Sequence, residues 1–285
     1  MGVVLALLSS GTWGVADFLG GLASRRARTV AVLALAYPIG AMLLTLAGLL
    51  LITGRLTGTG VLLGVVAGIS GASGIGLLYR ALAAGPMGVV SPVTAVVACA
   101  VPVIVGLTRG DQLTLLAMVG MAGAVVAIVL VSREREEFTR VRTSTVLISL
   151  ASGALMGGYL ALIGISPGDS GIWPTIVSRW TSTVVMLVAF GIVLYQRRRR
   201  PEPSRAHPFP WLLAVVSGVL DASANAMYQV ATQNGMLAVV AVVGSLYPVT
   251  TVLLAWIVLR ERLAGIQILG VGVACASAAV LSLSG

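Results

Sequence analysis

Residues 211–235 read WLLAVVSGVLDASANAMYQVATQNG. This stretch is hydrophobic along its length and carries a single charged side chain, Asp221. At about 1.5 Å per helical residue, Asp221 lies about 15 Å from Trp211, near the middle of a hydrocarbon layer about 30 Å thick. A charged group there costs roughly 2.5–3.5 kcal/mol on insertion scales, so it must face protein or a wet cavity. The stretch therefore predicts a membrane helix that contributes to a functional site.

The composition of the whole chain agrees with a membrane location. Of the 285 residues, 58% are hydrophobic and 9% are charged, and the mean hydropathy of +1.04 excludes a soluble globular domain. The net charge of +9 comes from arginines in short segments between apolar runs, which indicates membrane topology and not a nucleic-acid surface. We expect an all-α integral membrane protein whose partners are the lipid bilayer and a small-molecule substrate, with no nucleic acid.

Apolar runs of about 20 residues predict ten transmembrane helices. The predicted spans are 3–23, 29–52, 58–83, 86–107, 112–132, 145–165, 172–195, 211–234, 236–259 and 263–283. Most of the arginines follow the odd-numbered spans, in segments such as 25–28, 133–142 and 197–205. By the positive-inside rule, this distribution predicts that both termini lie outside the cytoplasm of a cell, on the far side of an inner or plasma membrane.

The spans repeat along the chain. An offset of 150 residues superposes Val65-Val66-Ala67-Gly68 on Val215-Val216-Ser217-Gly218, and this register continues through the following spans. Nearer the start, an offset of 142 superposes Gly11 on Gly153. The difference between the offsets is absorbed by the longer Arg-rich segment 197–206. We therefore predict two homologous five-helix repeats.

The odd number of helices in each repeat has a mechanical consequence. We place the first repeat at residues 1–132, a connecting loop at 133–144 and the second repeat at 145–285. A unit of five spans starts and ends on opposite sides of the membrane, so two such units in series have inverted topology. Inverted repeats allow one protein to alternate between inward-open and outward-open states around a midplane site. This pattern favours a transporter over a receptor or a scaffold.

Polar side chains in the span 211–234 form one stripe. Asp221, Asn225, Tyr228 and Thr232 are spaced by four, three and four residues, which places them along one helix face. We predict that Asp221, Asn225 and Tyr228 contact the substrate. Interhelical hydrogen bonding is the alternative role, and it applies most directly to Asn225 and Thr232.

Asp17 is a second candidate in the first span. It lies about 12 Å from the end of its helix, so it either belongs to a binding site or forms a salt bridge with Arg25 or Arg26. Trp13 lies one turn away on the same face and completes an aromatic and acidic wall. The repeat places Asp17 opposite Tyr159, which gives the substrate site two different polar groups at equivalent positions.

Arg179 is the basic candidate, about 9 Å from the interfacial Trp173 along its helix. Three roles are open: snorkelling to the headgroups, pairing with Asp221, or binding a substrate carboxylate through its planar fork. The repeat aligns Arg179 with Tyr37 and Trp180 with Pro38, so we include Tyr37 and Trp180 among the substrate-binding candidates.

The chain resembles the EamA-type ten-helix members of the drug/metabolite transporter superfamily. The resemblance covers nearly the whole chain and rests on the two repeats, on Gly11-Thr12-Trp13-Gly14, and on an acidic and then apolar junction near the end of each repeat. That junction is Gly110-Asp111-Gln112-Leu113 in the first repeat and Arg260-Glu261-Arg262-Leu263 in the second. The resemblance implies a secondary transporter, often an exporter of amino acids or related metabolites. It also implies cytoplasmic termini, in contrast to the arginine distribution.

Other chemistry has little support in the sequence. There is no Gly-rich phosphate loop beside a lysine, no metal-ligand constellation and no nucleophile paired with a base, so we expect neither an enzyme nor a cofactor or metal site. We expect a monomer or a homodimer. The alternative of another class is a membrane sensor or assembly subunit without transport.

The predicted function is secondary-active or facilitative transport of a small metabolite by alternating access, with export of an amino acid or related compound as the first candidate. Arg179 and its aromatic neighbours suit a carboxylate. Asp17 beside Trp13 suits a cationic amine or drug, exported in exchange for protons. If protons are coupled, Asp221 or Asp17 is the expected carrier, because burial favours the neutral form of a carboxyl.

Overall fold

A computed structural model describes most of the chain as helices, with no strand among the residues that it describes. Those residues are 1–50, 54–84, 87–132, 142–199, 208–260 and 263–283. The first half contains α1 (Gly2–Ser24), α2 (Thr29–Leu50), α3 (Gly58–Ala84), α4 (Met87–Thr108) and α5 (Leu115–Val131). The second half contains α6 (Thr143–Gly164), a short 3-10 turn η1 (Gly168–Ser170), α7 (Trp173–Arg199), α8 (Trp211–Gln233), α9 (Leu237–Gly244), α10 (Tyr247–Leu259) and α11 (Gly265–Leu283).

The predicted spans agree in position with these helices. In the described part of the chain, eight segments are long and apolar enough to cross a membrane, one of them Leu237–Leu259 across α9 and α10. The apolar stretches Val93–Thr108 in α4 and Leu115–Val131 in α5 are shorter. The predicted linker 133–144 ends early, because α6 begins at Thr143. Residues 133–141, segment 200–207 and Glu261 lie outside the described residues.

The ninth predicted span, 236–259, is interrupted. α9 ends at Gly244, and α10 begins at Tyr247 after Ser245 and Leu246. Pro248 explains the break, because it lacks an N–H and its ring clashes with the carbonyl four residues earlier, whereas the first turn of a new helix accepts it. The predicted span 236–259 therefore corresponds to the segment Leu237–Leu259, divided between α9 and α10. α2 stays continuous across Pro38.

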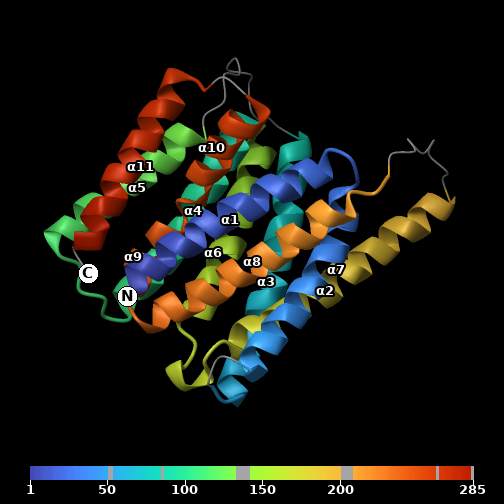
Figure 1. Cartoon of the computed structure of the whole chain (residues 1–285), viewed down its shortest axis with the longest axis horizontal. Coiled ribbons are helices and arrows are strands. Elements are labelled where there is room, and N and C mark those ends of the chain that lie inside the picture. The colour runs from blue at the N-terminus through green and yellow to red at the C-terminus, as the bar shows by residue number, and fades with distance from the viewer. Residues whose placement is uncertain (51–53, 85–86, 133–141, 200–207, 261–262, 284–285) are drawn as a thin grey trace.

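The two halves pack against each other through equivalent pairs of helices (Figure 1). α1 packs on α8, and its counterpart α6 packs on α3. α2 packs on α8 in the same way as α7 packs on α3. α5 with α11 forms one flank of the bundle, and α2 with α7 forms the opposite flank (Figure 1). This reciprocal packing matches the two repeats predicted from the sequence.

Two equivalent glycines lie at close helix crossings between the halves. A Cβ atom at Gly68 of α3 would overlap the carbonyl oxygen of Ser178 in α7. A Cβ atom at Gly218 of α8 would overlap the carbonyl oxygen of Ala36 in α2. Small residues allow membrane helices to approach this closely and to gain van der Waals contact. The repeated Val-Val-(Ala/Ser)-Gly motif therefore has the same packing role in both halves.

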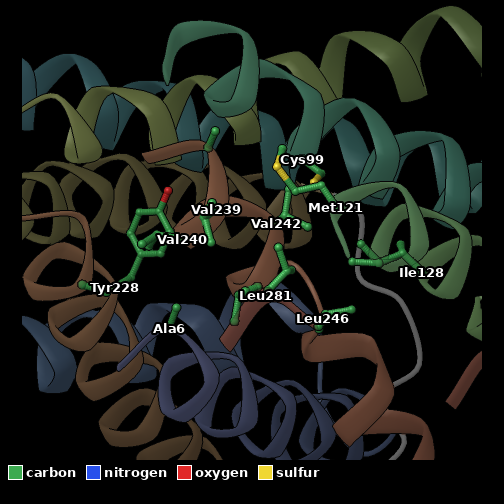
Figure 2. Packing of buried hydrophobic residues seen from close by; sticks show 14 of the residues in the cluster. Ala6, Cys99, Met121, Ile128, Tyr228, Val239, Val240, Val242, Leu246 and Leu281 are labelled. Atoms are coloured by element: carbon green, nitrogen blue, oxygen red, sulfur yellow. The ribbon is translucent and has the colours of Figure 1, made fainter. Parts of the chain in front are cut away.

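The interior is built from small side chains around the buried α9. Every residue of α9 is buried, and Figure 2 shows Val239, Val240 and Val242 between Tyr228 on one side and Cys99 and Met121 on the other. Large apolar side chains, such as Leu46 of α2, Val184 of α7 and Leu269 of α11, are exposed on the outside. This distribution suits a protein whose outer surface is covered by lipid, because lipid tails solvate such side chains.

Candidate functional site

A cavity of about 170 Å³ lies between the two halves. On the volume that one water requires, this space holds on the order of ten water-sized groups, so it suits a small metabolite. Its lining comes from both halves: Trp13, Asp17, Tyr37, Gly71, Ile75, Ala95 and Ala98 from the first, and Met156, Tyr159, Leu160, Arg179, Ser182, Asp221, Asn225, Gly244, Ser245 and Tyr247 from the second. Neither α5 nor α11 contributes to the lining among the described residues.

Equivalent positions of the two repeats line the cavity. At the sequence offsets of 142 and 150, the lining contains the equivalent pairs Asp17 and Tyr159, Tyr37 and Arg179, Gly71 and Asp221, Ile75 and Asn225, and Ala95 and Ser245. The backbone positions are therefore pseudo-symmetric, but the side chains differ within every pair. A cavity of this kind presents different groups to the two ends of an asymmetric ligand.

The second half contributes an ion pair between the buried Arg179 and the partly buried Asp221. Arg179 Nη2 lies 2.5 Å from Asp221 Oδ2. The guanidinium also lies over the ring of Tyr37 from the first half, 4.7 Å from its centroid. Because the Arg179 side chain is buried within the bundle, snorkelling to the headgroups does not occur. Of the three roles left open by the sequence, pairing with Asp221 is the one that the structure shows.

A hydrogen-bond network extends this pair to α6. Asn225 Nδ2 donates to Asp221 Oδ1 at 3.2 Å, and the Tyr159 hydroxyl donates to Asn225 Oδ1. Asp221 and Asn225 are one turn apart on α8, so both side chains face the cavity and reach each other. The network fixes the orientation of the carboxylate that holds Arg179.

Asp17 has a different environment. Its side chain is exposed, although it lies in the interior of the bundle, because it lines the cavity. Among the described residues, no arginine forms an ion pair with it, so the predicted alternative of a salt bridge with Arg25 or Arg26 is not observed. Of the two carboxylates considered as proton carriers, Asp221 is already paired with a cation and Asp17 is not.

Aromatic rings form the wall beside Asp17. Trp13 lies one turn before Asp17 on α1, and its ring is 6.5 Å from that of Tyr247 and 5.5 Å from that of Tyr228. Trp13 and Tyr247 line the cavity. Tyr228 lies behind Trp13 instead, almost completely buried, and its hydroxyl donates to the carbonyl oxygen of Leu160 at 3.3 Å.

Two predicted substrate contacts therefore lie outside the cavity. Tyr228 supports the wall from outside the lining: it lies two turns, about 10 Å, along α8 from Asp221, and it packs behind Trp13. Trp180 is 40% exposed on the outside, and its Nε1 donates to Thr45 Oγ1 at 3.0 Å. One residue beyond Arg179 turns the helix by about 100°, so the two side chains face different surroundings. The Thr232 hydroxyl donates to the carbonyl oxygen of Gln229 within α8, so its hydrogen bond is made inside its own helix.

Three polar residues of the lining were not among the predicted contacts. Ser182 lies one turn after Arg179 on α7, and its hydroxyl donates to the carbonyl oxygen of Gly68 at 2.9 Å. Ser245 and Tyr247 flank the break between α9 and α10. For Ser245 and Tyr247, the sequence signal was the Tyr247-Pro248 pair, because a proline can interrupt a membrane helix and an interrupted helix commonly lines a substrate site.

Both halves of the sequence match one family. The model of the EamA-like transporter family matches residues 1–133 and again residues 143–283. The chain belongs to the EamA-like transporter family. A solved structure described as "Crystal structure of protein" superposes on this EamA chain with a TM-score of 0.79 and 14% sequence identity, over 100% of this chain and 99% of the other, which shows a shared fold. A search of curated proteins found no match.

Family membership confirms the predicted resemblance to the drug/metabolite transporter superfamily. It identifies the chain as a multi-pass membrane protein of a transporter family, consistent with its apolar helices. The cavity of this EamA protein lies between the two segments that match the family, and both segments contribute to its lining. A small-molecule substrate is therefore the ligand class to consider for the cavity.

Proposed function

We propose that this chain is a secondary transporter that moves a small metabolite across a membrane by alternating access. The observation that carries the proposal is the lining of the cavity by equivalent positions of two repeats, with ionisable side chains inside. A charged group inside a membrane bundle usually marks the path of an ion or a substrate. The residues proposed to contact the substrate are Trp13, Asp17, Tyr37, Tyr159, Arg179, Asp221 and Asn225.

The proposed mechanism uses ten spans in two inverted five-helix repeats, at residues 1–132 and 145–285. The reciprocal packing of α1 on α8 and of α6 on α3 supports it, because each half repeats the contacts of the other. Exchange of conformations between the halves then opens the same cavity to either side. We place the protein in an inner or plasma membrane with both termini outside the cytoplasm, as the arginines predict.

Two substrate classes fit a metabolite of this size. An amino acid or related compound, moved outward, would place its carboxylate near Arg179 and its ammonium near Asp17. A cationic amine would use Asp17 and the Trp13 and Tyr247 rings alone. The second class is favoured by the ion pair, because Asp221 already neutralises Arg179.

The experiment is a flux assay on the full chain in proteoliposomes. Purified protein is screened by thermal shift against amino acids, amines and nucleosides, and radiolabelled hits are tested for uptake into loaded vesicles. We expect saturable uptake that is lost when Ala95→Leu fills the cavity, whereas Trp180→Phe, outside the cavity, leaves it unchanged. A ligand that binds but never crosses the bilayer would contradict transport and indicate a sensor.

A further inference from the structure

The cavity lining has an unbalanced charge. Three of its side chains carry formal charges: Asp17, Arg179 and Asp221. Arg179 and Asp221 neutralise each other at 2.5 Å, so Asp17 gives the lining one net negative charge when its carboxyl is ionised. Bilayer interiors do not tolerate an uncompensated charge well, and a ligand of opposite charge relieves the cost. The lining therefore complements a monovalent cation.

Arg179 offers little to a carboxylate ligand. One side of its guanidinium contacts Asp221, and its face lies over Tyr37. Asn225 and Tyr159 hold the Asp221 carboxylate in place. A substrate carboxylate would have to compete with Asp221 and would bring a second negative charge near it. This arrangement disfavours a zwitterion relative to a simple amine.

The surroundings of Asp17 suit an ammonium group with an apolar body. Trp13 lies one turn away on the same helix, and Tyr247 packs edge-on against it, with 6.5 Å between ring centroids. Cations bind over aromatic faces, and best over tryptophan. The same lining includes the apolar side chains of Ile75, Ala95 and Ala98.

We propose that the substrate is a small monovalent organic amine, whose ammonium group pairs with Asp17 and whose apolar body contacts Trp13 and Tyr247. This inference rests on the proposed transport function and narrows its substrate class. The cavity volume of about 170 Å³ suits a compact amine. Asp17 is then the residue that selects for charge, and the Arg179–Asp221 pair is a neutral part of the wall.

Three probes with the same aromatic body separate the classes: phenethylamine is a cation, phenylalanine is a zwitterion and 2-phenylethanol is neutral. Calorimetric titration of the full chain in nanodiscs is expected to show phenethylamine binding about ten-fold or more tightly than the other two, as one charge-assisted contact allows. Equal or tighter binding of phenylalanine overturns the inference. Proteoliposome flux of an amino acid in that case leaves the proposed transport intact, whereas an absence of flux for every ligand that binds contradicts transport itself.

Variants test the role of Asp17 separately from folding. Asp17→Asn is expected to remove the preference for phenethylamine, and Asp17→Glu to keep it. Asp169→Asn changes an exposed carboxylate on η1 and serves as the matched control, with unchanged binding. Asp221→Asn releases Arg179 and removes the net charge of the lining, so it is expected to shift the preference toward phenylalanine. A preference for phenethylamine that survives Asp17→Asn overturns the inference.

A second feature, independent of the cavity charge, is the acidic junction at the end of the first repeat. Asp111 Oδ2 accepts the backbone N–H of Ala238, in the first turn of α9, at 2.9 Å. Gly110 has a φ of +99°, which favours glycine, and its turn places Asp111 over that helix end. A Cβ atom at Gly106 would overlap Asp111 Oδ2 and lie 2.9 Å from the Ala238 nitrogen.

We infer that Asp111 is a positioning residue that fixes α9 of the opposite half. A carboxylate at a helix N-terminus satisfies a free N–H and complements the helix dipole. The other end of α9 lines the cavity at Gly244 and Ser245, where the helix is interrupted. A contact at one end of this short helix therefore sets the position of the cavity wall at its other end.

The test measures the exposure of that wall in the full chain. A Ser245→Cys reporter, in a background with Cys99→Ala and Cys275→Ala, is labelled with a water-soluble maleimide in proteoliposomes. Adding Asp111→Ala is expected to change the labelling rate about ten-fold, as loss of a charged hydrogen bond allows. Adding Gly106→Ala, with the carboxylate present but displaced, should have the same effect. Asp111→Asn keeps an acceptor and should stay near the parent rate. Labelling unchanged by both Asp111→Ala and Gly106→Ala overturns the role.

Discussion

The two halves of the molecule share one scaffold but contribute different chemistry to the cavity. Equivalent glycines, Gly68 and Gly218, form equivalent helix crossings. Inside the cavity the equivalence ends: Gly71 and Ile75 of the first half stand where Asp221 and Asn225 stand in the second. Backbone symmetry supports an exchange of conformations, whereas side-chain asymmetry allows the cavity to hold an asymmetric ligand. Substitutions at equivalent positions test how far each statement holds.

The largest effect is expected at the equivalent positions Arg179 and Tyr37. Arg179→Met leaves the partly buried Asp221 carboxylate without its cation and should lower the free energy of unfolding by up to about 3–5 kcal/mol. Tyr37→Phe keeps the ring beneath the guanidinium and should cost much less. Denaturant unfolding in mild detergent measures both. Equal decreases in unfolding free energy for the two variants would contradict the central role of the ion pair between α7 and α8.

A smaller effect on stability and transport is expected from substitutions at Asn225 and at its equivalent, Ile75. Asn225→Ile removes the acceptor of the Tyr159 hydroxyl and a donor to Asp221. Unsatisfied buried partners cost about 1–3 kcal/mol, and transport should fall with them. Ile75→Val deletes one methyl group and should cost about 0.5–1.5 kcal/mol. Unfolding and flux measurements check both variants. An Asn225→Ile protein as stable and as active as the parent would show that the hydrogen-bond network contributes to neither property.

The glycine crossings should respond alike in both halves. Gly68→Ala and Gly218→Ala each force a methyl group against a carbonyl oxygen and should each cost about 1–3 kcal/mol. Gly191→Ala, also in a helix but with no atom within 4 Å of its new Cβ, is the control. It should be neutral or stabilising by up to about 1 kcal/mol. A large difference between the first two variants would contradict equivalent packing of the repeats.

The smallest effect is expected at Trp180, which is next to Arg179 in sequence but outside the cavity. Trp180→Phe removes one hydrogen bond to Thr45, worth about 0.6 kcal/mol in a membrane protein. Its unfolding free energy should change by about that much, and its transport kinetics should match the parent. A large rise in KM for this variant would show that the cavity extends beyond the residues assigned to it.

Much of the fold could be predicted from the sequence, because the two properties that determine it are periodic and local. Long apolar runs indicate helices in a membrane, and a constant offset reveals the repeat. The span 236–259 was predicted but the ends of α9 and α10 within it were not, since a proline inside an apolar run ends one helix and is tolerated in another, as Pro38 shows. Whether neighbouring helices accommodate the ring depends on packing that the sequence does not show.

Part of the site could also be predicted from local sequence properties. Asp17, Asp221 and Asn225 were found because polar groups are costly in a bilayer, and all three line the cavity. Tyr228 was included for its place on the polar stripe and Trp180 for its place in the repeat, but Tyr228 lies farther along α8 behind Trp13, and Trp180 faces the outside. The pairing of Arg179 with Asp221 was one of three alternatives, and the choice depended on the relative rotation of α7 and α8.

The measurement that tests the central claim most directly is counterflow of radiolabelled phenethylamine in proteoliposomes that contain the parent protein or Asp17→Asn. The account predicts that the parent accumulates label when loaded with unlabelled amine and that Asp17→Asn does not, although its unfolding temperature stays close to that of the parent. Equal counterflow by the two proteins, or none by the parent, would contradict transport of an amine through Asp17 in this cavity.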